Sequence, residues 1–467
     1  MTRLERFLKR WKIKPARLAL ESGYSRQHLL KIRMGLMEPS RPCIAAIVGA
    51  ASRLSNSAVR PEELFVLSED PVWERQQAKL SRRAAAEQRR LRIEARALVA
   101  SLETAGLPFG KWMAAIEAED GTSLAVATAL YERGRELTFE NPRVAERVHR
   151  VAASLAGKLP PSAAALSVHG RALMGRGNAL AHMGEYPDAF AAFDEAEALL
   201  TKSPHCIGDL AQAWYSRART HFQQTAFEEA MRWTRISCAI FDAIGDKRLG
   251  ALARLLEGTI LYDTGNPAEA ERLLRTTIEP LERAKDHASL AFAYLDIGRC
   301  NINLGEVKAA RAWLEKARAA FARLRMRSEV VRAEWCLAWL RALHEDVAGG
   351  LAQLHIARRS FEELEMPTDA ALVGLDIVEV LLLRDIDGAA AKAAQVCRSI
   401  VELFERHGET ANARRAIAEL REAVQRNSAD ETDVREVRGF LRRWSNDPRT
   451  VFAPRKDTTG NDSTDPR

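Results

Sequence analysis

The sequence predicts an all-α protein. Apolar residues recur at the i, i+3, i+4 spacing of amphipathic helices along all 467 residues, and strand-like alternation of Val, Ile and Thr is nearly absent. A hydrophobic content of 47% supports an extensive core, while 28% charged residues and a mean hydropathy of −0.25 are typical of a globular chain. A pattern that repeats about every 40 residues predicts a stack of similar units behind a different N-terminal segment.

Residues 1–70 are predicted to form a small domain of five short helices. LERFLKRW, PARLALES and RQHLLKIRM read as the first three helices, and CIAAIVGAASRL and EELF as the last two. Gly23, Tyr24 and Ser25 form the tight turn between the second and third helices, with Ser25 as the N-cap. Gly35 and Pro39 end the third helix.

Positive charge is concentrated at this end of the chain. Residues 1–70 hold 13 Lys and Arg against 7 Asp and Glu, and residues 71–100 hold 8 against 3. The rest of the chain is therefore slightly acidic, because the whole carries only +7. This asymmetry favours a polyanionic partner for the first hundred residues only.

The segment KPARLALESGYSRQHLLKIRMGLMEPS, residues 14–40, resembles the Cro/repressor-type (XRE) helix-turn-helix family. The agreement covers the core pair, the turn, the buried side of the third helix and its exit: Leu18, Ala19, Gly23, Leu29, Ile32, Gly35 and Pro39. Pro15 and Arg33 depart from the Gln and Glu usual in the family, and Pro15 removes a habitual phosphate contact. The resemblance implies a domain that binds double-stranded DNA and places its third helix in the major groove.

Four side chains are the candidates for reading base edges. Arg26, Gln27 and His28 occupy the first turn of the third helix, and Lys31 lies one turn further on. Arg can bond guanine with two hydrogen bonds and Gln can bond adenine in the same way. By the resemblance, the backbone phosphates are contacted by Lys14, Arg17, Ser25 and Arg41. The alternative is that these are solvated residues of a domain that contacts protein.

Residues 71–124 are predicted to be a basic helical linker. Their long helix either packs against the array or a partner subunit, or connects the domains as a solvated rod.

Residues 125–425 are predicted to form a right-handed α-solenoid of about six to seven helix hairpins. Pairs of mostly small residues twelve positions apart recur with steps of 41, 40, 40, 40 and 40 residues, and a turn lies between the members of each pair. We expect the small residues to let the two helices approach, and larger side chains to fill the gap between neighbours. The pairs are Gly177/Ala189, Ala218/Ala230, Gly258/Ala270, Gly298/Ala310, Ala338/Gly350 and Val378/Ala390, and the fillers are Phe193, Leu274 and Leu314.

The stretches GNALAHMGEYPDAFAAFDEA and GRCNINLGEVKAARAWLEKA resemble the tetratricopeptide repeat. The period of 40 exceeds the family's usual 34, and we place the extra residues in a longer second helix and its loop. Stacked HEAT-type repeats are the alternative.

The tetratricopeptide resemblance implies that the first helix of each hairpin lines a groove that binds peptides or protein segments. Two positions four residues apart on that helix would face the groove, where Asn and Arg can bond a peptide backbone or a carboxylate. Simple solvation of a polar face is the alternative. The positions are Asn178/His182, Arg219/Gln223, Thr259/Asp263 and Arg299/Asn303, followed by Trp339/Leu343.

Several classes of function are not expected. No phosphate-binding loop, HExxH or GxSxG motif points to an enzyme or a cofactor, and the six cysteines are too widely spaced for a zinc finger. Without a signal-peptide core or an apolar run of membrane-spanning length, we expect a cytoplasmic protein with no membrane partner. Residues 426–454 should cap the array with a helix, and residues 455–467 should be a disordered tail.

Together, the two resemblances imply a cytoplasmic transcriptional regulator that senses a signalling peptide or protein. Such a regulator would form a homodimer through its array and space two recognition helices about 34 Å apart. Two hypotheses stay open beside it. One is an interaction scaffold whose N-terminal domain binds protein, and the other is a regulator whose array serves only for dimerisation.

Overall fold

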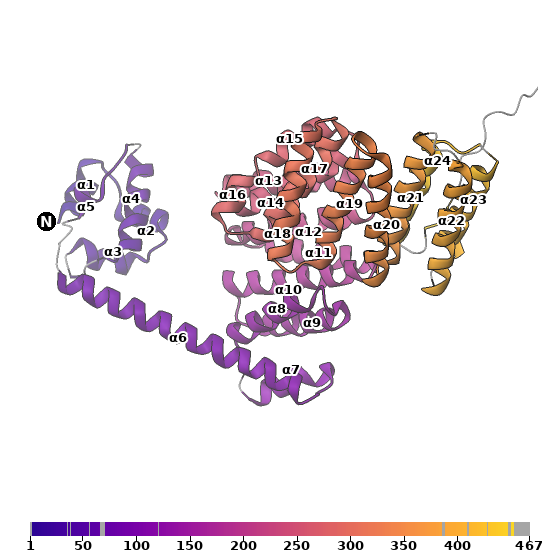
Figure 1. The fold of residues 1–467 in the computed structure, drawn as a ribbon. Helices are drawn as coiled ribbons and strands as arrows, with labels where there is room; N and C mark the ends of the chain where they lie inside the picture. The colour runs from indigo at the N-terminus through magenta and orange to yellow at the C-terminus, as the bar shows by residue number, and fades with distance from the viewer. Residues whose placement is uncertain are drawn as a thin grey trace, which may run out of the picture. The chain divides into compact units, whose positions relative to one another are not determined.

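The computed structural model describes residues 2–34, 36–37, 39–55, 57–65, 71–119, 121–384, 388–408, 411–426, 428–446 and 450–452. The side chains of Glu62, residues 71–84, Asn412, Glu431 and Asn446 are outside this description. The regular structure of the described residues is helical throughout, which confirms the all-α prediction (Figure 1). The tail predicted for residues 455–467 lies outside the described residues. The chain divides into two compact units, Met1–Arg90 and Leu91–Arg467.

The first unit contains the five short helices that the sequence predicts. They pack around a common core in which Leu4, Leu18, Leu29, Ile47 and Leu64 are at most 1% exposed. The helices are α1 (Arg3–Arg10), α2 (Pro15–Ser22), α3 (Arg26–Arg33), α4 (Arg41–Ser55) and α5 (Pro61–Leu64).

The turn between α2 and α3 has the predicted geometry. Gly23 follows α2 with φ +73°, a left-handed conformation that glycine adopts without steric cost. Ser25 then caps α3, because its Oγ accepts a hydrogen bond of 3.1 Å from the backbone N–H of His28. Pro15 begins α2, where the helix needs no N–H from that residue.

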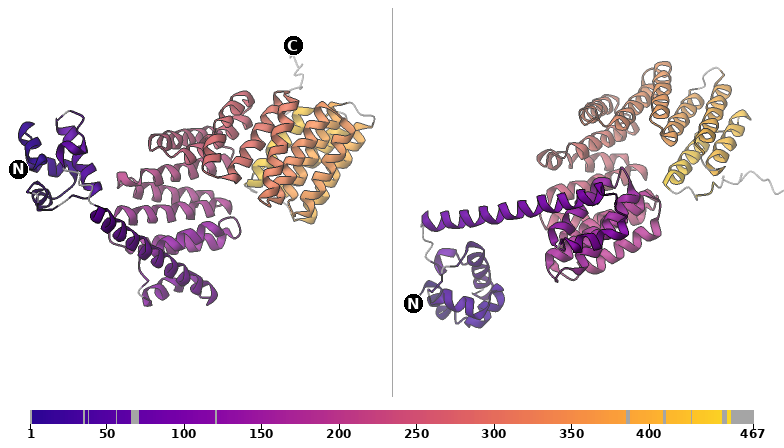
Figure 2. Two further views of the ribbon diagram at one scale, coloured as in Figure 1. Left: turned by 60° about the vertical axis from the view of Figure 1, so that its left-hand side comes forward. Right: turned by 90° about the horizontal axis from the view of Figure 1, so that it is seen from below.

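The second unit is a stack of antiparallel helices in which consecutive helices pack against each other, as in a solenoid (Figure 2). The long helix α6 (Pro71–Thr104) and α7 (Phe109–Ala118) precede the stack. The helices that follow are α8 (Leu124–Leu137), α9 (Pro142–Lys158), α10 (Ala163–His182), α11 (Tyr186–Leu200), η1 (Pro204–Cys206), α12 (Ile207–Gln223), α13 (Phe227–Ala243), α14 (Lys247–Asp263), α15 (Pro267–Arg275), α16 (Ile278–Arg283), α17 (His287–Asn303), α18 (Val307–Arg323), α19 (Arg327–His344), α20 (Val347–Glu363), α21 (Pro367–Leu383), α22 (Ala389–Arg406), α23 (Ala411–Gln425) and α24 (Glu431–Asn446).

The small anchor residues permit the close helix contacts that the sequence predicts. A Cβ atom added to Gly177 would lie 2.5 Å from the Phe193 ring, and one added to Gly258 would lie 2.6 Å from Leu274. Both helices of the hairpin formed by α17 and α18 have 17 residues. Our expectation that the extra residues of the 40-residue period lie in the second helix and its loop was therefore wrong, because the two helices are equal in length.

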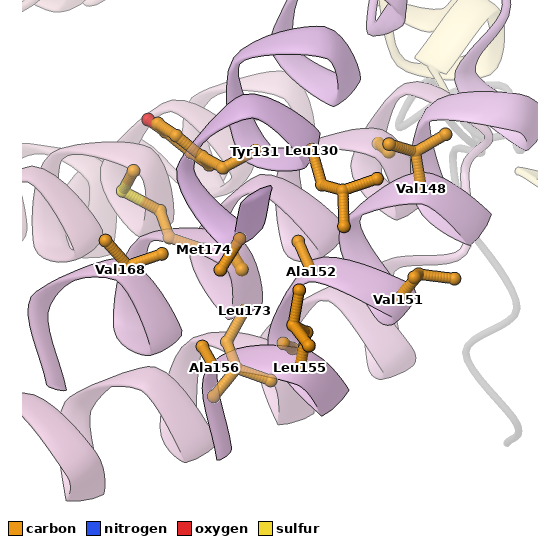
Figure 3. Packing of buried hydrophobic residues seen from close by; sticks show 14 of the residues in the cluster. Leu130, Tyr131, Val148, Val151, Ala152, Leu155, Ala156, Val168, Leu173 and Met174 are labelled. Carbon is orange, nitrogen blue, oxygen red and sulfur yellow. The ribbon is translucent and has the colours of Figure 1, made fainter. Parts of the chain in front are cut away.

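A continuous apolar core joins the first hairpins to the helices before them. Leu130, Val148, Leu155 and Leu173 interleave between α8, α9 and α10 (Figure 3). The same cluster includes buried residues of the predicted linker, from the second half of α6 and from α7: Ala95, Val99, Leu102, Trp112 and Ile116. This part of the linker packs against the array within its unit. Within the described part of the chain, no helix is long and apolar enough to cross a membrane.

Candidate functional site

Helix α3 presents three of its predicted base readers to solvent. Arg26, Gln27 and Lys31 are exposed, whereas Leu29 and Ile32 on the opposite side are 1% and 4% exposed. The buried pair fixes the rotation of α3 about its axis. The long polar side chains of its first turns therefore project outward from the five-helix core.

The fourth predicted base reader, His28, packs against other residues of its own domain. Its ring stacks on Tyr24 with a centroid distance of 5.0 Å and an interplanar angle of 21°. Its Nε2 atom also lies 3.8 Å from Sγ of buried Cys43 on α4. A contact with a base would require the ring to leave both neighbours, so Arg26 and Gln27 are better placed than His28.

Two apolar residues on the outer side of α3 were missed by the sequence analysis. Leu30 is 48% exposed and Met34 is 58% exposed. They follow Arg26 at steps of four residues, which is the spacing that could have revealed them. Apolar side chains at such positions can contact the methyl group of thymine.

The predicted phosphate contacts lie at helix beginnings. Lys14 precedes α2, Arg17 lies in its first turn, and Arg41 begins α4; all three are exposed. Ser25 uses an oxygen lone pair in the α3 cap, and its hydroxyl proton is not needed for that bond. Helix beginnings carry backbone N–H groups that favour phosphate.

In the array, the predicted groove positions divide into two groups. The first group lies on α10 and α12 and comprises Asn178, His182, Arg219 and Gln223. His182 is exposed at the end of α10, and the other three are half-buried. Partial burial and then the charge of Arg219 lower the pKa of His182.

The second group lies on α14 and α17 and comprises Thr259, Asp263, Arg299 and Asn303, of which the first three interact with other residues of the chain. Arg299 lies 3.0 Å from Asp296 and 3.7 Å from Asp263, and its guanidinium sits 4.2 Å from the centre of the Tyr262 ring. Thr259 donates a hydrogen bond of 2.9 Å to Asp296. Asn303 is exposed at the end of α17.

Helix α24 supplies cations to the same region. Arg442 lies 3.9 Å from Asp263, and Arg438 lies 2.6 Å from Asp376 and also pairs with Glu379. Trp335 donates a hydrogen bond of 2.7 Å to Asp376. Burial raises the pKa of Asp263 and of Asp376, whereas the neighbouring arginines act in the opposite direction. Sequence analysis missed Asp376, Glu379 and Arg438.

The described residues contain no group of three or more His, Cys, Asp or Glu side chains that could hold a metal ion.

Comparison with known proteins gives the fold class. No protein-family model matches the chain, and no curated protein matches it. Among solved structures, it is similar to a signal-transduction ATPase with a tetratricopeptide repeat sensor from Pyrococcus horikoshii, at 12% identity and a TM-score of 0.50; the match covers 93% of this chain and 64% of that one. Aspartyl phosphate phosphatase F from Bacillus subtilis gives 12% identity and a TM-score of 0.48, over 84% of this chain and 93% of its own.

A Rap protein solved with competence and sporulation factor gives 16% identity and a TM-score of 0.46, over 76% of this chain and 100% of its own. At these identities the similarity concerns the fold alone, and among the three only the ATPase reaches a TM-score of 0.50. The fold therefore defines a helical-repeat protein of the tetratricopeptide type, in which five short helices, α1 to α5, precede the repeats.

Proposed function

We propose that this protein is a sequence-specific DNA-binding transcriptional regulator of the Cro/repressor type. The observation that carries the proposal is the orientation of α3. Its capped first turn exposes Arg26 and Gln27, and Leu29 and Ile32 anchor its other side. The basic surplus of the first hundred residues supports the same partner, since phosphates supply much of the affinity for DNA.

We propose further that the array mediates dimerisation and receives a peptide or protein signal. The first group of groove residues, on α10 and α12, supports this role better than the second. Asn178, Arg219 and Gln223 offer amide and guanidinium groups, whereas Asp263 and Arg299 already pair with each other and with neighbours. A peptide should therefore bind nearer to α10 and α12 than to α17.

Selection of bound fragments from random duplex DNA tests the reader. The parent chain should enrich one sequence with two related half-sites, as a dimer requires. Arg26→Ala and Gln27→Ala should each remove the preference for that sequence while leaving thermal unfolding nearly unchanged. Lys9→Ala, at an exposed position of α1, is the control and should retain the preference. Equal affinity of the parent and both α3 variants for the selected duplex would refute the assignment.

The scaffold hypothesis predicts a different result in the same assay. A chain that uses its first unit to bind protein should enrich no duplex. It should also lack the steep loss of affinity with rising salt that phosphate contacts produce. For the groove, Asn178→Ala and Arg219→Ala should weaken any response to a ligand without changing the DNA affinity of the unliganded protein.

A further inference from the structure

A pocket of about 360 Å³ lies on the array where α20 and α22 both pack against α21. Four apolar side chains line it: Leu351, Ile377, Leu381 and Val396. Two cationic side chains, Arg358 and Lys392, also contribute to the lining. None of these residues belongs to the predicted groove or to the DNA reader.

Arg358 is an unusual residue to find in such a wall. It is 8% exposed, and its Nη1 donates a hydrogen bond of 2.9 Å to Ser399. Its Nε lies 3.3 Å from Glu362 but has no hydrogen-bond partner among the described residues. A guanidinium has five N–H donors, so this buried cation retains capacity for an acceptor. Burial lowers the pKa of Arg358, and the charge of Arg406 acts in the same direction against that of Glu362.

In the preceding repeat, a carboxylate on the same helix neutralises the corresponding arginine. Forty residues earlier, Arg318 on α18 lies 2.5 Å from Glu315, and its side chain is 42% exposed. In the later repeat, His355 stands at the position of Glu315, so the carboxylate one turn before the arginine is missing. Arg358 is also far more buried than its counterpart.

The apolar wall differs from the preceding repeat in the same manner. Leu351 and Leu381 correspond to Arg311 and Arg341. Arg311 pairs with Glu345, and Arg341 lies 2.6 Å from Asp346. Ion pairs therefore occupy the earlier position, whereas leucines line the later one. The pocket combines an apolar surface with a cation that its neighbours compensate only in part.

We infer that this pocket binds a small amphipathic carboxylate. The carboxylate would accept hydrogen bonds from Arg358, whose planar fork matches its two oxygens, and would be attracted by Lys392. The apolar part of the ligand would contact Leu351, Leu381 and Val396. The volume is at the lower end of the roughly 300–1,000 Å³ of ligand pockets, which suits a short-chain or single-ring acid. This site is separate from the proposed peptide groove and adds a small-molecule input.

Calorimetric titration of the full chain with octanoate and with benzoate tests the inference. At least one of them should bind with a Kd between about 10 µM and 1 mM, as expected for ligands of this size. Octylammonium should bind far more weakly than octanoate, because the pocket is cationic. Binding of neither acid at about 10 mM, or equal binding of octanoate and octylammonium, overturns the proposal.

Two variants and a control locate the site. Arg358→Met should weaken the binding at least tenfold. It should still fold, because the side chain of the remaining partner, Glu362, is 29% exposed and can be solvated. Lys392→Met, at an exposed position, should weaken binding severalfold and decides the matter if the first variant is unstable. Arg359→Met removes an exposed arginine outside the lining and should leave the Kd unchanged. Unchanged binding in folded Arg358→Met and Lys392→Met overturns the assignment.

Discussion

Arg442 on α24 places its Nη1 atom 3.9 Å from Oδ1 of Asp263, at the end of α14. The opposite side of α24 is apolar and anchored, since Phe440 and Trp444 are 0% and 2% exposed. Helix α24 therefore joins the end of the stack to a hairpin far earlier in the sequence. The sequence predicted that Asp263 faces a partner-binding groove, but its carboxylate instead pairs with an arginine of the same chain.

The ion pairs of Arg438 should hold α24 in place. Arg438→Met removes the cation that pairs with Asp376 and Glu379, whose side chains are only 10% and 6% exposed. Loss of one partner of a buried ion pair costs about 3–5 kcal/mol. We expect the free energy of unfolding, measured in urea, to fall by that amount. We also expect faster hydrogen exchange in α21 and α24. Arg443→Met, at an exposed position of α24, is the control. Equal exchange in both variants would show that the apolar side alone secures the helix.

The phosphate contacts should appear in the salt dependence of DNA binding. Each phosphate neutralised contributes about 0.9 to the slope of log K against log salt concentration. Lys14→Ala and Arg17→Ala should each reduce the slope by about that amount and weaken binding to all duplexes alike. Lys9→Ala should keep the parent slope. If either α2 variant also keeps it, that residue does not contact phosphate.

Buried His149 should make the stability of the array depend on pH. It is 0% exposed, glycines at positions 134 and 175 face its ring, and burial and then the charge of Arg135 lower its pKa to about 4. The ordinary value in the unfolded chain is 6.5. Below pH 6.5 the unfolded state therefore binds a proton that the folded state does not bind until about pH 4. The free energy of unfolding should fall by about 3 kcal/mol across this range, and this contribution is constant above it.

His149→Leu isolates this contribution in urea unfolding between pH 4 and 8. The variant carries a constant cost if leucine fits less well, but the difference between parent and variant should change with pH in the stated direction. A difference that is independent of pH would mean that His149 titrates alike in both states.

The local features of this fold could be predicted, and the distant contacts could not. The roles of Gly23 and Ser25 depend on residues only a few positions away, so the local sequence predicts them. The fixed spacing between Gly177 and Ala189 likewise predicts the close approach of two helices. The position of His28 depends on Cys43 on another helix, and that of Asp263 on Arg442. No periodicity connects those pairs, because they arise from the packing of separate elements.

The turns between hairpins share a backbone conformation that their residue types do not reveal. Residues 245, 285, 325 and 365, spaced 40 apart, all have φ between +54° and +75°, yet only the first is glycine. Arg325 thus holds a left-handed conformation that costs a residue with a Cβ about 1 kcal/mol. Arg325→Gly should raise the free energy of unfolding by up to about that amount, measured in urea. Arg323→Gly, two residues earlier at the last position of α18, should lower it by up to about 1 kcal/mol. A loss of stability in both variants would mean that the Arg325 side chain contributes more than its backbone conformation costs.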